Sequence, residues 1–463
     1  MPLILGANTL SAGGYGVDNS LRFNSGSSDN LTKTFSTSGT SDKIKTFSFW
    51  LKRATSSTEV VIISAGSASR DFIRFESDGT LTFRRVSTFQ LTTSQVFRDV
   101  SAWYHIVIAI DTTQATDSNR VKFYVNGSQV TAFGTTTYPS QNTTLKLGTD
   151  NPNHIGNDSE QTTPYFNGYM SEFYMIDGQA LTPSDFGEFD SDTGIWKPIA
   201  YTGSYGTNGF FLEFKDSSAL GDDTSGTSND FTVNNLTSID QTTDTPTNNF
   251  ATMNPLASQS GSGSSSGAFT FSNGNLSVSG ITSETGIANF GVSTGKWFWE
   301  VKVVTDQNGL AIGACNEGQN LDDELGYQSG SSQSYAKAFG YYGDNGNKFS
   351  TMGDGSQMSA YGDAISVNDI IGVAMNLDDN EVTFYLDGVA QGTFSITALG
   401  SGENYFPAVG NWSVATIATD FNFGNPPFAI TTGNEDANGY GNFEYTVPPG
   451  YYALNTKNLA EYG

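Results

Sequence analysis

The sequence predicts an all-β protein with two domains of the sandwich or barrel type, and three observations support this. A seven-residue phrase occurs twice, at 121–127 and 382–388, and each copy alternates apolar and polar residues before an Asn-Gly or Asp-Gly pair. Alternation gives a strand two different faces, and such pairs accept the positive φ of a tight hairpin turn. Turn residues recur about every 8–12 positions, while helix signals are nearly absent. The 463 residues suffice for two or three domains with cores of their own.

The first half of the chain contains a series of strand patterns after an irregular, Gly-rich arm at residues 1–18. Strands are expected at 20–23, 45–53, 60–64, 72–75, 80–84 and 103–111. Phe47 and Phe49 share one face of their strand, and Asp78-Gly79 reads as a hairpin turn. His105 lies in the middle of the last strand among apolar residues, which favours a packed, hydrogen-bonded histidine over a catalytic one.

The second half predicts a hinge, a second β domain and a tail. The hinge is expected at 196–207, the second domain at 208–430, and an extended tail at 431–463 that packs on this domain or on a neighbouring chain. The Ser/Gly-rich stretch 258–267 reads as a loop within the second domain rather than as a tether, because strand patterns already begin near Phe210.

The net charge of −26 is unevenly distributed along the chain. Residues 1–100 contain 11 of the 21 basic residues but only 8 of the 47 acidic ones. The simplest interpretation is a solvated acidic surface. In the alternative, the basic end docks on a neighbouring subunit or an anionic glycan. The acidic remainder argues against nucleic acid as a partner, because phosphate binding requires clustered cations.

The cysteine content and the lengths of the apolar runs indicate in which cellular compartment the chain folds. Cys315 is the only cysteine, so no intrachain disulfide forms, which fits folding in a reducing cytoplasm. The N-terminus lacks the charged region and apolar run of a signal peptide, and no apolar stretch approaches the length of a membrane span. We expect a chain without a signal peptide or membrane insertion.

Residues 18–195 resemble laminin-G-like domains of the concanavalin A-like jelly-roll superfamily. The segments that carry this resemblance are 47–50, 103–107, 121–127, 145–148 and 166–173, in this order. The resemblance implies a jelly-roll domain at 19–195 with two packed antiparallel sheets. It also implies loops at one rim that often bind glycans, sometimes through calcium.

Oxygen-rich loops of this domain supply candidate ligands for a glycan or for calcium. Asp150, Asn157 and Asp158 are the candidates for glycan binding, and Asp150 and Asp158 are also candidates for calcium. The alternative is an ordinary polar loop. Members of the family commonly carry Asp-Glu after the strand at 166–170, whereas this chain has Ser171-Glu172, which weakens the case for calcium.

Two further acidic positions are candidates for metal binding. Asp222 and Asp223 lie in the loop 216–226, where the alternatives are a calcium loop and a plain turn after a strand. The spacing does not match an EF-hand. His154, in the loop after Asp150, has no second histidine or cysteine at ligand spacing, which argues against a zinc site there.

Residues 268–430 resemble SPRY domains closely. The segments that carry this resemblance are 295–301, 311–314, 339–342, 369–375, 382–388, 406–409 and 421–424. It implies a second concanavalin A-like sandwich that binds partners through loops at one end. Tyr327 and Trp412 are candidates for a sugar-stacking platform, with core packing as the alternative.

The sequence does not show the catalytic pattern of glucanases on this fold, which places paired carboxylates on one strand as Glu-x-Asp-x-x-Glu. The carboxylate clusters at 188–192, 322–324 and 378–381 lie in loop-like sequence instead. We therefore expect a protein that is not an enzyme, with a glycan hydrolase as a minor alternative.

The whole arrangement resembles virion proteins of tailed phages, particularly marine ones. The resemblance rests on the order of the two domains, the segments 206–212 and 244–250, and the Pro-Gly-Tyr tail. It implies a homo-oligomeric structural protein in a head or tail appendage or fibre. Such a protein is assembled in the host cytoplasm, contacts other virion proteins and binds host surface glycans. The alternative is a purely structural capsid decoration or adaptor. The chain shows no coiled-coil or repetitive stalk.

Overall fold

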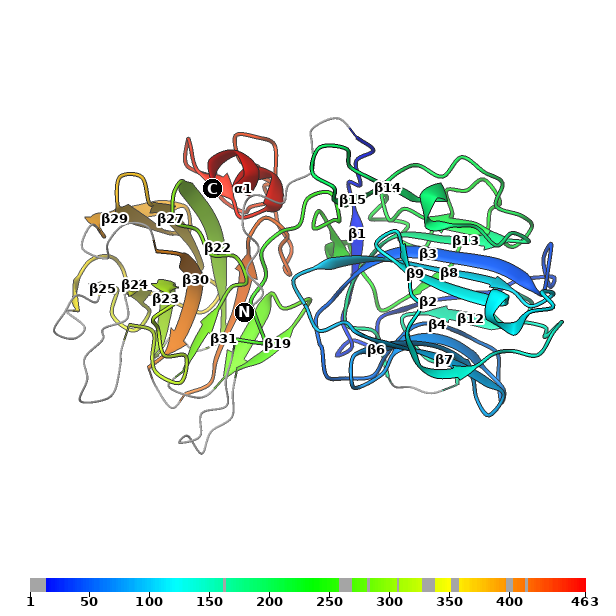
Figure 1. Ribbon diagram of the computed structural model, residues 1–463. Helices are drawn as coiled ribbons and strands as arrows, with labels where there is room; N and C mark the ends of the chain where they lie inside the picture. The colour runs from blue at the N-terminus through cyan, green and yellow to red at the C-terminus, as the bar shows by residue number, and fades with distance from the viewer. Residues whose placement is uncertain are drawn as a thin grey trace. The chain divides into compact units, whose positions relative to one another are not determined.

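The computed structural model describes residues 14–160, 164–257, 269–280, 284–305, 308–326, 338–350, 358–396, 403–412 and 415–463. They form two compact units that divide between Asn249 and Phe250. We call residues 14–249 the N-terminal unit and residues 250–463 the C-terminal unit; in Figure 1 the first runs from blue to green and the second from green to red. Their regular secondary structure is almost all antiparallel strand, which confirms the predicted fold class.

The N-terminal unit contains two large sheets. The β3 sheet has the order β10 (Ser128–Gln129), β9 (Val121–Val125), β8 (Trp103–Asp111), β3 (Ile44–Arg53), β13 (Gly168–Asp177), β1 (Ser20–Phe23) and β18 (Gln241–Thr242), with β16 (Phe210–Leu212) also on β13. The β4 sheet has the order β11 (Phe133–Thr137), β7 (Phe89–Val96), β6 (Thr80–Arg85), β5 (Asp71–Phe75), β4 (Val60–Ala65), β12 (Pro152–Ile155), β2 (Asn30–Thr34) and β17 (Thr232–Asn234). The remaining elements are the hairpin β14 (Gly187–Phe189) and β15 (Trp196–Pro198) and the 3-10 helices η1 (Asp117–Asn119), η2 (Pro183–Asp185) and η3 (Ser238–Asp240).

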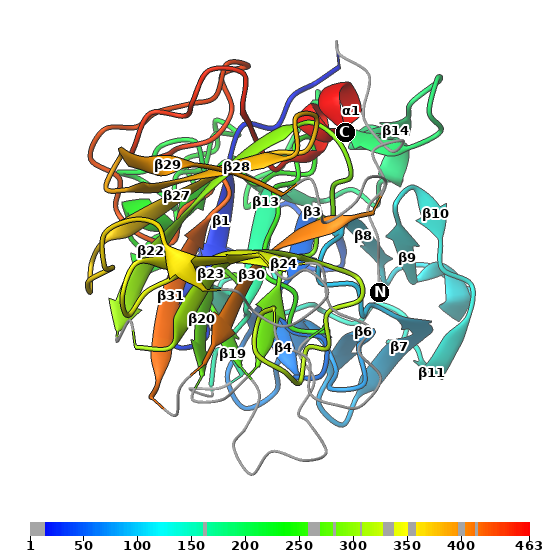
Figure 2. The ribbon, with the colours of Figure 1, turned by 90° about the vertical axis from the view of Figure 1, so that its left-hand side faces the viewer.

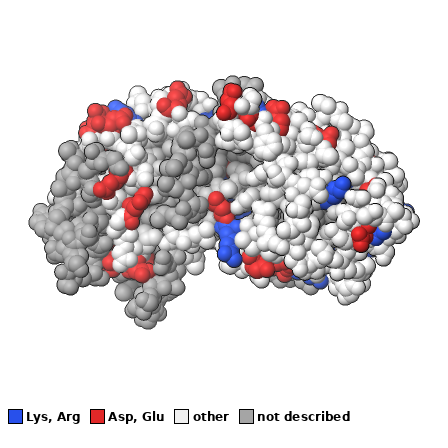
Figure 3. Space-filling model, viewed as in Figure 1, with Lys and Arg blue, Asp and Glu red and all other residues white. Residues whose placement is uncertain are grey.

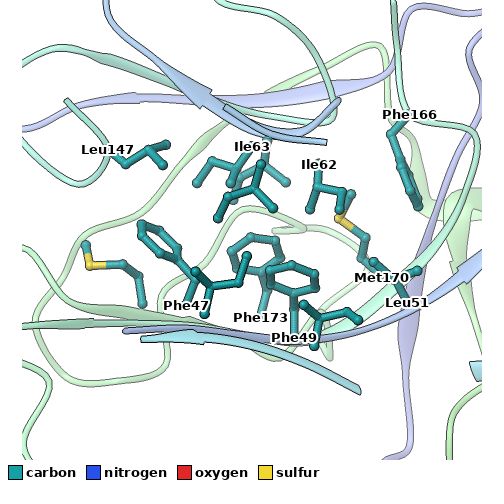
Figure 4. Packing of buried hydrophobic residues seen from close by; sticks show 14 of the residues in the cluster. Phe47, Phe49, Leu51, Ile62, Ile63, Leu147, Phe166, Met170 and Phe173 are labelled. Atoms are coloured by element: carbon teal, nitrogen blue, oxygen red, sulfur yellow. The ribbon is translucent and has the colours of Figure 1, made fainter. Parts of the chain in front are cut away.

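The core of this unit lies between the two sheets. Phe47 and Phe49 alternate along β3 and point at the β4 sheet, where they meet Ile62 and Ile63 (Figure 4). Phe49 also stacks on Phe173 of β13, with ring centroids 4.9 Å apart. Each such side chain is fully buried and contributes about 1.5–3 kcal/mol through removal from water. The shared face predicted for Phe47 and Phe49 is thereby confirmed.

The C-terminal unit repeats this plan with two further sheets. The β22 sheet has the order β19 (Thr270–Ser272), β20 (Ser277–Gly280), β31 (Ile417–Asn422), β22 (Lys296–Thr305), β27 (Ile370–Asn376), β28 (Glu381–Leu386) and β29 (Val389–Ser395), with β32 (Tyr452–Ala453) also on β22. The β23 sheet has the order β21 (Thr285–Ile287), β30 (Tyr405–Asn411), β23 (Leu310–Asn316), β24 (Ala338–Tyr342), β25 (Asn347–Ser350) and β26 (Ser359–Ala360). Figure 2 views this unit with β27, β28 and β29 above β23, β24 and β30.

The core of the C-terminal unit is aromatic. Trp297 and Trp299 of β22 are fully buried and belong to the same apolar cluster as Phe339 and Tyr341 of β24. Alternation along β22 sends Phe298 to the opposite face, where it meets Phe443 of the C-terminal segment with ring centroids 5.3 Å apart. The β22 sheet is therefore covered on both faces.

The repeated phrase forms the same hairpin in both units. Asn126 and Gly127 join β9 to β10 with φ of 46° and 78°. Asp387 and Gly388 join β28 to β29 with φ of 47° and 79°. Both hairpins lie at the end of a sheet. The tight turn predicted from Asn-Gly and Asp-Gly is confirmed, because two successive positive φ values are what such a turn requires.

The boundary between the units differs from the expected hinge at 196–207. Phe210–Leu212 pairs with β13, Thr232–Asn234 with β2, and Gln241–Thr242 with β1. Residues 208–249, expected in the second domain, thus complete the sheets of the first one. These strands have only two or three residues each, so their sequence carries too little periodicity to indicate which sheet they join.

Two buried ion pairs fasten this added segment. Lys45 and Lys52 lie near opposite ends of β3 and are both buried. Lys45 Nζ donates to Asp177 at 2.8 Å, and Asp177 in turn accepts from the backbone N–H of Asn208 at 3.0 Å. Lys52 Nζ donates to Asp244, which also accepts from Trp103 Nε1 at 3.1 Å. The segments 206–212 and 244–250 are therefore structural.

The C-terminal residues 431–463 pack on the C-terminal unit, which was one of the two expected alternatives. Tyr452–Ala453 pairs in parallel with β22, and α1 (Thr456–Tyr462) follows. The buried carboxylate of Glu300 on β22 accepts from the backbone N–H groups of Glu444 and Tyr445 at 3.0 and 2.8 Å. The helix was not expected from the sequence. Its N-cap Asn455 accepts from the N–H of Asn458.

The basic residues near the start of the chain are mostly used within the N-terminal unit. Seven of them form ion pairs: Arg22–Asp240, Lys43–Asp42, Lys45–Asp177, Lys52–Asp244, Arg70–Asp158, Arg74 with Glu59 and Glu76, and Arg85–Asp71. This arrangement argues against the alternative in which the basic end docks on an acidic partner.

Residues 250–463 contain 21 acidic and only five basic residues. On the face shown in Figure 3, Asp and Glu cover more of the described surface than Lys and Arg do. No helix in the described part of the chain has the length and hydropathy needed to cross a membrane.

Candidate functional site

The three glycan candidates of the first domain are not brought together as a free set of ligands. Asp150 is exposed and lies 3.4 Å from the Ser38 hydroxyl. Asn157 is buried, with its Oδ1 3.0 Å from His154 Nδ1. Asp158 is also buried and pairs with Arg70 Nε at 3.0 Å. Asn157 and Asp158 therefore hold their own loop in place.

The two calcium candidates of the loop 216–226 lie in different surroundings. Asp222 is exposed, whereas Asp223 accepts four hydrogen bonds, from Phe211 N, Ser225 N, Thr227 Oγ1 and Asn229 N, at 2.7–3.0 Å. Burial opposes ionisation of Asp223, but these hydrogen bonds outweigh it and lower the pKa. Within the described ranges, no group of three or more His, Cys, Asp or Glu side chains has the geometry to hold a metal.

The two stacking candidates of the second domain have different outcomes. Tyr327 lies outside the described residues. Trp412 is half-buried, and its Nε1 donates to the Leu325 carbonyl at 3.2 Å. Its ring packs against Tyr342 and Phe349 with centroids 5.5 and 5.3 Å away. Trp412 thus takes part in an aromatic cluster on the β23 sheet, in line with the core-packing alternative.

His105 is a packed, hydrogen-bonded residue, as expected. Trp196 Nε1 donates to its Nδ1 at 2.9 Å, so Nε2 carries the proton and donates to Ser48 Oγ at 2.9 Å. Its ring stacks on Trp50, with centroids 4.8 Å apart. Burial lowers the pKa of His105 to about 3. The imidazole is therefore neutral and structural.

A hollow of about 320 Å³ lies on the outer face of the β3 sheet, and none of the site residues predicted from the sequence lines it. We call it the Tyr124 hollow. Its lining residues are Ala109, Asp111, Gln114, Asn119, Lys122, Tyr124, Ala180, Leu181 and Thr182. These residues come from β8, β9, the connection between them, and the segment after β13. The volume fits one sugar ring or a molecule of similar size.

The floor of the Tyr124 hollow follows from strand alternation. Val121 and Phe123 point into the core, so Lys122 and Tyr124 stand on the outer face of β9. Lys122 pairs in register with Ala109 of β8. Because the alanine side chain is only a methyl group, it rises little above the sheet and leaves space for the hollow. The mixed face of the repeated phrase was the signal from which this site could have been anticipated.

One wall is a loop held by Arg120. The guanidinium of Arg120 donates to the carbonyls of Gln114, Ala115 and Pro139 at 2.8–2.9 Å. Asp111 holds the start of this loop, because its carboxylate accepts from Thr113 and Gln114. Burial opposes ionisation of Asp111, but these hydrogen bonds prevail and lower its pKa.

The opposite wall is fixed by a buried hydroxyl. Thr46 Oγ1 on β3 donates to the Gln179 carbonyl at 2.8 Å and accepts from Leu181 N at 2.8 Å. The next residue, Thr182, is the N-cap of η2 and forms a capping box with Asp185. Both walls are therefore built by defined polar contacts, and the hollow is preorganised.

A second hollow of similar volume lies on the outer face of the β4 sheet. Its lining residues are Thr32, Lys33, Thr34, Pro152, Asn153, His154, Asp230 and Thr232. It contains no Phe, Tyr or Trp side chain. The Tyr124 hollow is the better candidate for an organic ligand, because it combines an aromatic ring with polar groups.

Comparisons with known proteins agree with the two-domain description. Residues 16–185 match the family model of the concanavalin A-like lectin/glucanases superfamily, and residues 296–426 match that of the SPRY domain. Ran-binding protein 9 of Xenopus laevis is 31% identical over 138 residues, which are 29% of this chain and 23% of that protein. Ran-binding protein 10 of Danio rerio is 32% identical over 138 residues, which are 29% of this chain and 20% of that protein. The chain thus spans about a fifth of the length of these relatives.

Solved structures show similarity to parts of the chain. The SPRY domain of human HERC1 is 15% identical with a TM-score of 0.28, covering 36% of this chain and 96% of that domain. The heptameric SAP-like pentraxin from Limulus polyphemus is 16% identical with a TM-score of 0.28, covering 36% of this chain and 78% of that one. From the family matches, this chain joins a laminin-G-like domain and a SPRY domain, two domain types that typically bind protein or carbohydrate.

Proposed function

We propose that the chain is a binding protein of a tailed-phage virion whose N-terminal unit holds a sugar of the host surface in the Tyr124 hollow. The observation that carries the sugar-binding part is the hollow itself. It combines a half-exposed tyrosine, a low alanine floor and polar side chains within about 320 Å³.

The chemistry of this hollow suits a sugar ring. The C–H face of a sugar packs on an aromatic ring, while its hydroxyls need donors and acceptors at the edge. Tyr124 supplies the ring, and burial raises the pKa of its hydroxyl, which stays protonated and able to donate. Asn119 and Gln114 supply amide groups. The preorganised walls reduce the entropy that binding costs.

The virion part of the proposal is supported by the resemblance of the whole arrangement to structural proteins of tailed phages. The segments 206–212 and 244–250 contribute to that resemblance. They hold Asn208 and Asp244, which complete the buried contacts of Lys45 and Lys52. In this proposal the chain forms a homo-oligomer in a head or tail appendage, where other surfaces contact neighbouring virion proteins.

The test is binding of the purified full chain to an array of bacterial surface glycans, compared with two variants. Tyr124→Ala removes the stacking ring. Tyr385→Ala is the matched control, because Tyr385 holds the same position in the second copy of the repeated phrase. We expect Tyr124→Ala to lose at least about tenfold in affinity and Tyr385→Ala to bind as the wild type does. Equal binding by all three proteins would overturn the site.

The virion part needs a separate measurement. Host cells are incubated with the full chain before they are challenged with phage. We expect the wild type, but not Tyr124→Ala, to reduce phage adsorption. Sugar binding without any effect on adsorption would leave a glycan-binding protein and remove the role in host attachment.

A purely structural role is the second candidate, and β29 favours it. Among the described residues, this strand is the last of the β22 sheet on its side, and it carries no charged residue. Val389 at its start is 64% exposed. An uncharged, exposed edge offers unpaired backbone groups to a strand of another chain. Val389→Lys should weaken assembly with virion proteins in this case and leave sugar binding unchanged.

A further inference from the structure

We propose that the sugar held in the Tyr124 hollow carries a carboxylate, as in a uronic acid, and that Lys122 is the residue that selects it. This inference rests on the proposed function and adds the chemical class of the ligand. It derives from the charged groups of the hollow, where Lys122 forms no ion pair with any described residue.

Lys122 has no ion pair and no side-chain hydrogen bond within the described residues. It lies on the outer face of β9, opposite Ala109, with its side chain partly exposed at the hollow. Most other lysines and arginines of the N-terminal unit have carboxylate partners, such as Lys45 with Asp177. An ammonium at the edge of a concave site is able to bind an anion at little desolvation cost, because water still reaches it.

The neighbouring cation, Arg120, is bound to the backbone of the protein itself. Arg120 is two residues away, and its guanidinium donates to three backbone carbonyls of the loop. These contacts use three of the five N–H donors of Arg120, and Arg120 is not one of the residues that line the hollow. Within the lining set, Lys122 is therefore the group available for a negatively charged ligand.

Asp111, the carboxylate of the hollow, is already engaged. One oxygen accepts from the N–H and the hydroxyl of Thr113 at 3.0 and 2.6 Å, and the other accepts from Gln114 Nε2 at 2.5 Å. It does not lie within ion-pair distance of Lys122. A ligand carboxylate next to Lys122 thus replaces water and not an existing salt bridge.

The remaining groups fit a ring that bears such a carboxylate. Tyr124 follows Lys122 on the same face of the strand, so a ring stacked on Tyr124 brings an attached carboxylate toward the ammonium. The Asn119 amide makes no side-chain hydrogen bond within the described part of the chain and lines the same hollow. It is positioned to bind a ring hydroxyl. In the second copy of the phrase, Thr383 stands where Lys122 does, so the cation is particular to this unit.

The experiment measures how well the full chain distinguishes matched acidic and neutral sugars. The probes are the methyl glycosides of galacturonate and galactose and those of glucuronate and glucose, titrated by calorimetry or ligand-observed NMR. We expect the wild type to prefer the uronate by about tenfold, since a charge-assisted hydrogen bond is roughly twice as strong as a neutral one.

Two substitutions identify the source of that preference. Lys122→Met keeps the length and apolar stem but removes the charge. We expect the preference for the uronate to disappear while affinity for the neutral sugar stays the same. Lys122→Arg keeps the charge and should retain most of the preference. The thermal midpoints of both variants establish that the fold is unchanged.

The outcomes separate this inference from the proposed function. If the wild type binds acidic and neutral sugars equally, or if Lys122→Met keeps the preference, the role of Lys122 is overturned while sugar binding stands. If none of the four glycosides binds while the glycan array still shows binding that Tyr124→Ala loses, this inference fails and the proposed function stands. If Tyr124→Ala binds as the wild type does, the proposed function fails and this inference fails with it.

Discussion

Trp196 lies directly against Gly127, the glycine of the first repeated hairpin. A Cβ added at Gly127 would lie 2.4 Å from Trp196 Cε3. The second hairpin repeats this relationship, because a Cβ at Gly388 would lie 2.6 Å from Tyr445 Cδ1. In each unit an aromatic residue from a later segment of the chain packs against the turn. Each glycine therefore has two roles: it adopts the positive φ of the turn, and it allows the aromatic ring to approach closely.

Gly127→Ala is expected to lower the free energy of unfolding of the N-terminal unit by about 2–4 kcal/mol. The cost combines the positive φ with overlap on the Trp196 ring. Gly194→Ala is the matched control, because Gly194 has φ of 70° but nothing within 4 Å of an added Cβ. It should cost only about 1–2 kcal/mol. Urea unfolding followed by tryptophan fluorescence compares the two, and equal losses would contradict the role of the Trp196 contact.

Asp244→Asn is expected to destabilise the N-terminal unit by about 3–5 kcal/mol, because it leaves the Lys52 ammonium buried without its counter-ion. Both side chains of this pair are at most 1% exposed. The pair Lys215–Glu213 is the control, since Lys215 is 61% exposed. Glu213→Gln should change the unfolding free energy by less than about 1 kcal/mol. A small effect of Asp244→Asn would mean that residues 242–249 do not depend on the pair.

Glu300 should make the stability of the C-terminal unit depend on pH. Burial raises its pKa to about 7, although Tyr445 N, Glu444 N and Asn422 donate to it. The folded pKa exceeds the ordinary value of 4.5, so the stabilising contribution is complete below pH 4.5 and is lost as pH rises through about 7. The difference between the folded pKa and the ordinary pKa corresponds to about 3 kcal/mol of unfolding free energy.

Glu300→Gln is expected to flatten this dependence, as measured by denaturant unfolding between pH 4.5 and 8.5. Glu172 is the matched case in the N-terminal unit, where burial also raises the pKa to about 7. Tyr15 and Tyr174 donate to its carboxylate at 2.9 and 2.7 Å. Glu172→Gln should therefore flatten the dependence of the N-terminal unit alone. An unchanged pH profile in either variant would show that its carboxyl titrates normally.

Asp223→Asn is expected to cost about 1–3 kcal/mol in the N-terminal unit, because an amide no longer accepts all four of the hydrogen bonds that Asp223 receives. Asp222→Asn, at the exposed neighbouring position, should have almost no effect. Because the pKa of Asp223 is lowered, its contribution is present above the ordinary carboxyl pKa and lost as pH falls through the folded value. Thermal midpoints at pH 7 and pH 3 measure both. A similar loss in both variants would contradict the structural role of Asp223.

Local patterns were enough to predict the character of both units. Alternation identified the strands that contain Phe47 and His105, and Asn126-Gly127 identified the hairpin, because these features depend on neighbours in the sequence. The same reasoning gave His105 a packed environment. The order of such motifs was also sufficient for the two domain types.

Only the tertiary structure decided where the first unit ends and where its hollow lies. Phe210–Leu212 pairs with β13 although its sequence has no period that distinguishes the two units. The Tyr124 hollow exists because Ala109 and Ala180, which are far apart in the chain, leave a low floor and wall beside Tyr124. Asp158 and Asp223 looked like ligands in the sequence, but their partners are a distant arginine and the backbone of a folded loop. Each of these outcomes depends on which segments meet in space, and a linear pattern of residue types does not encode that meeting.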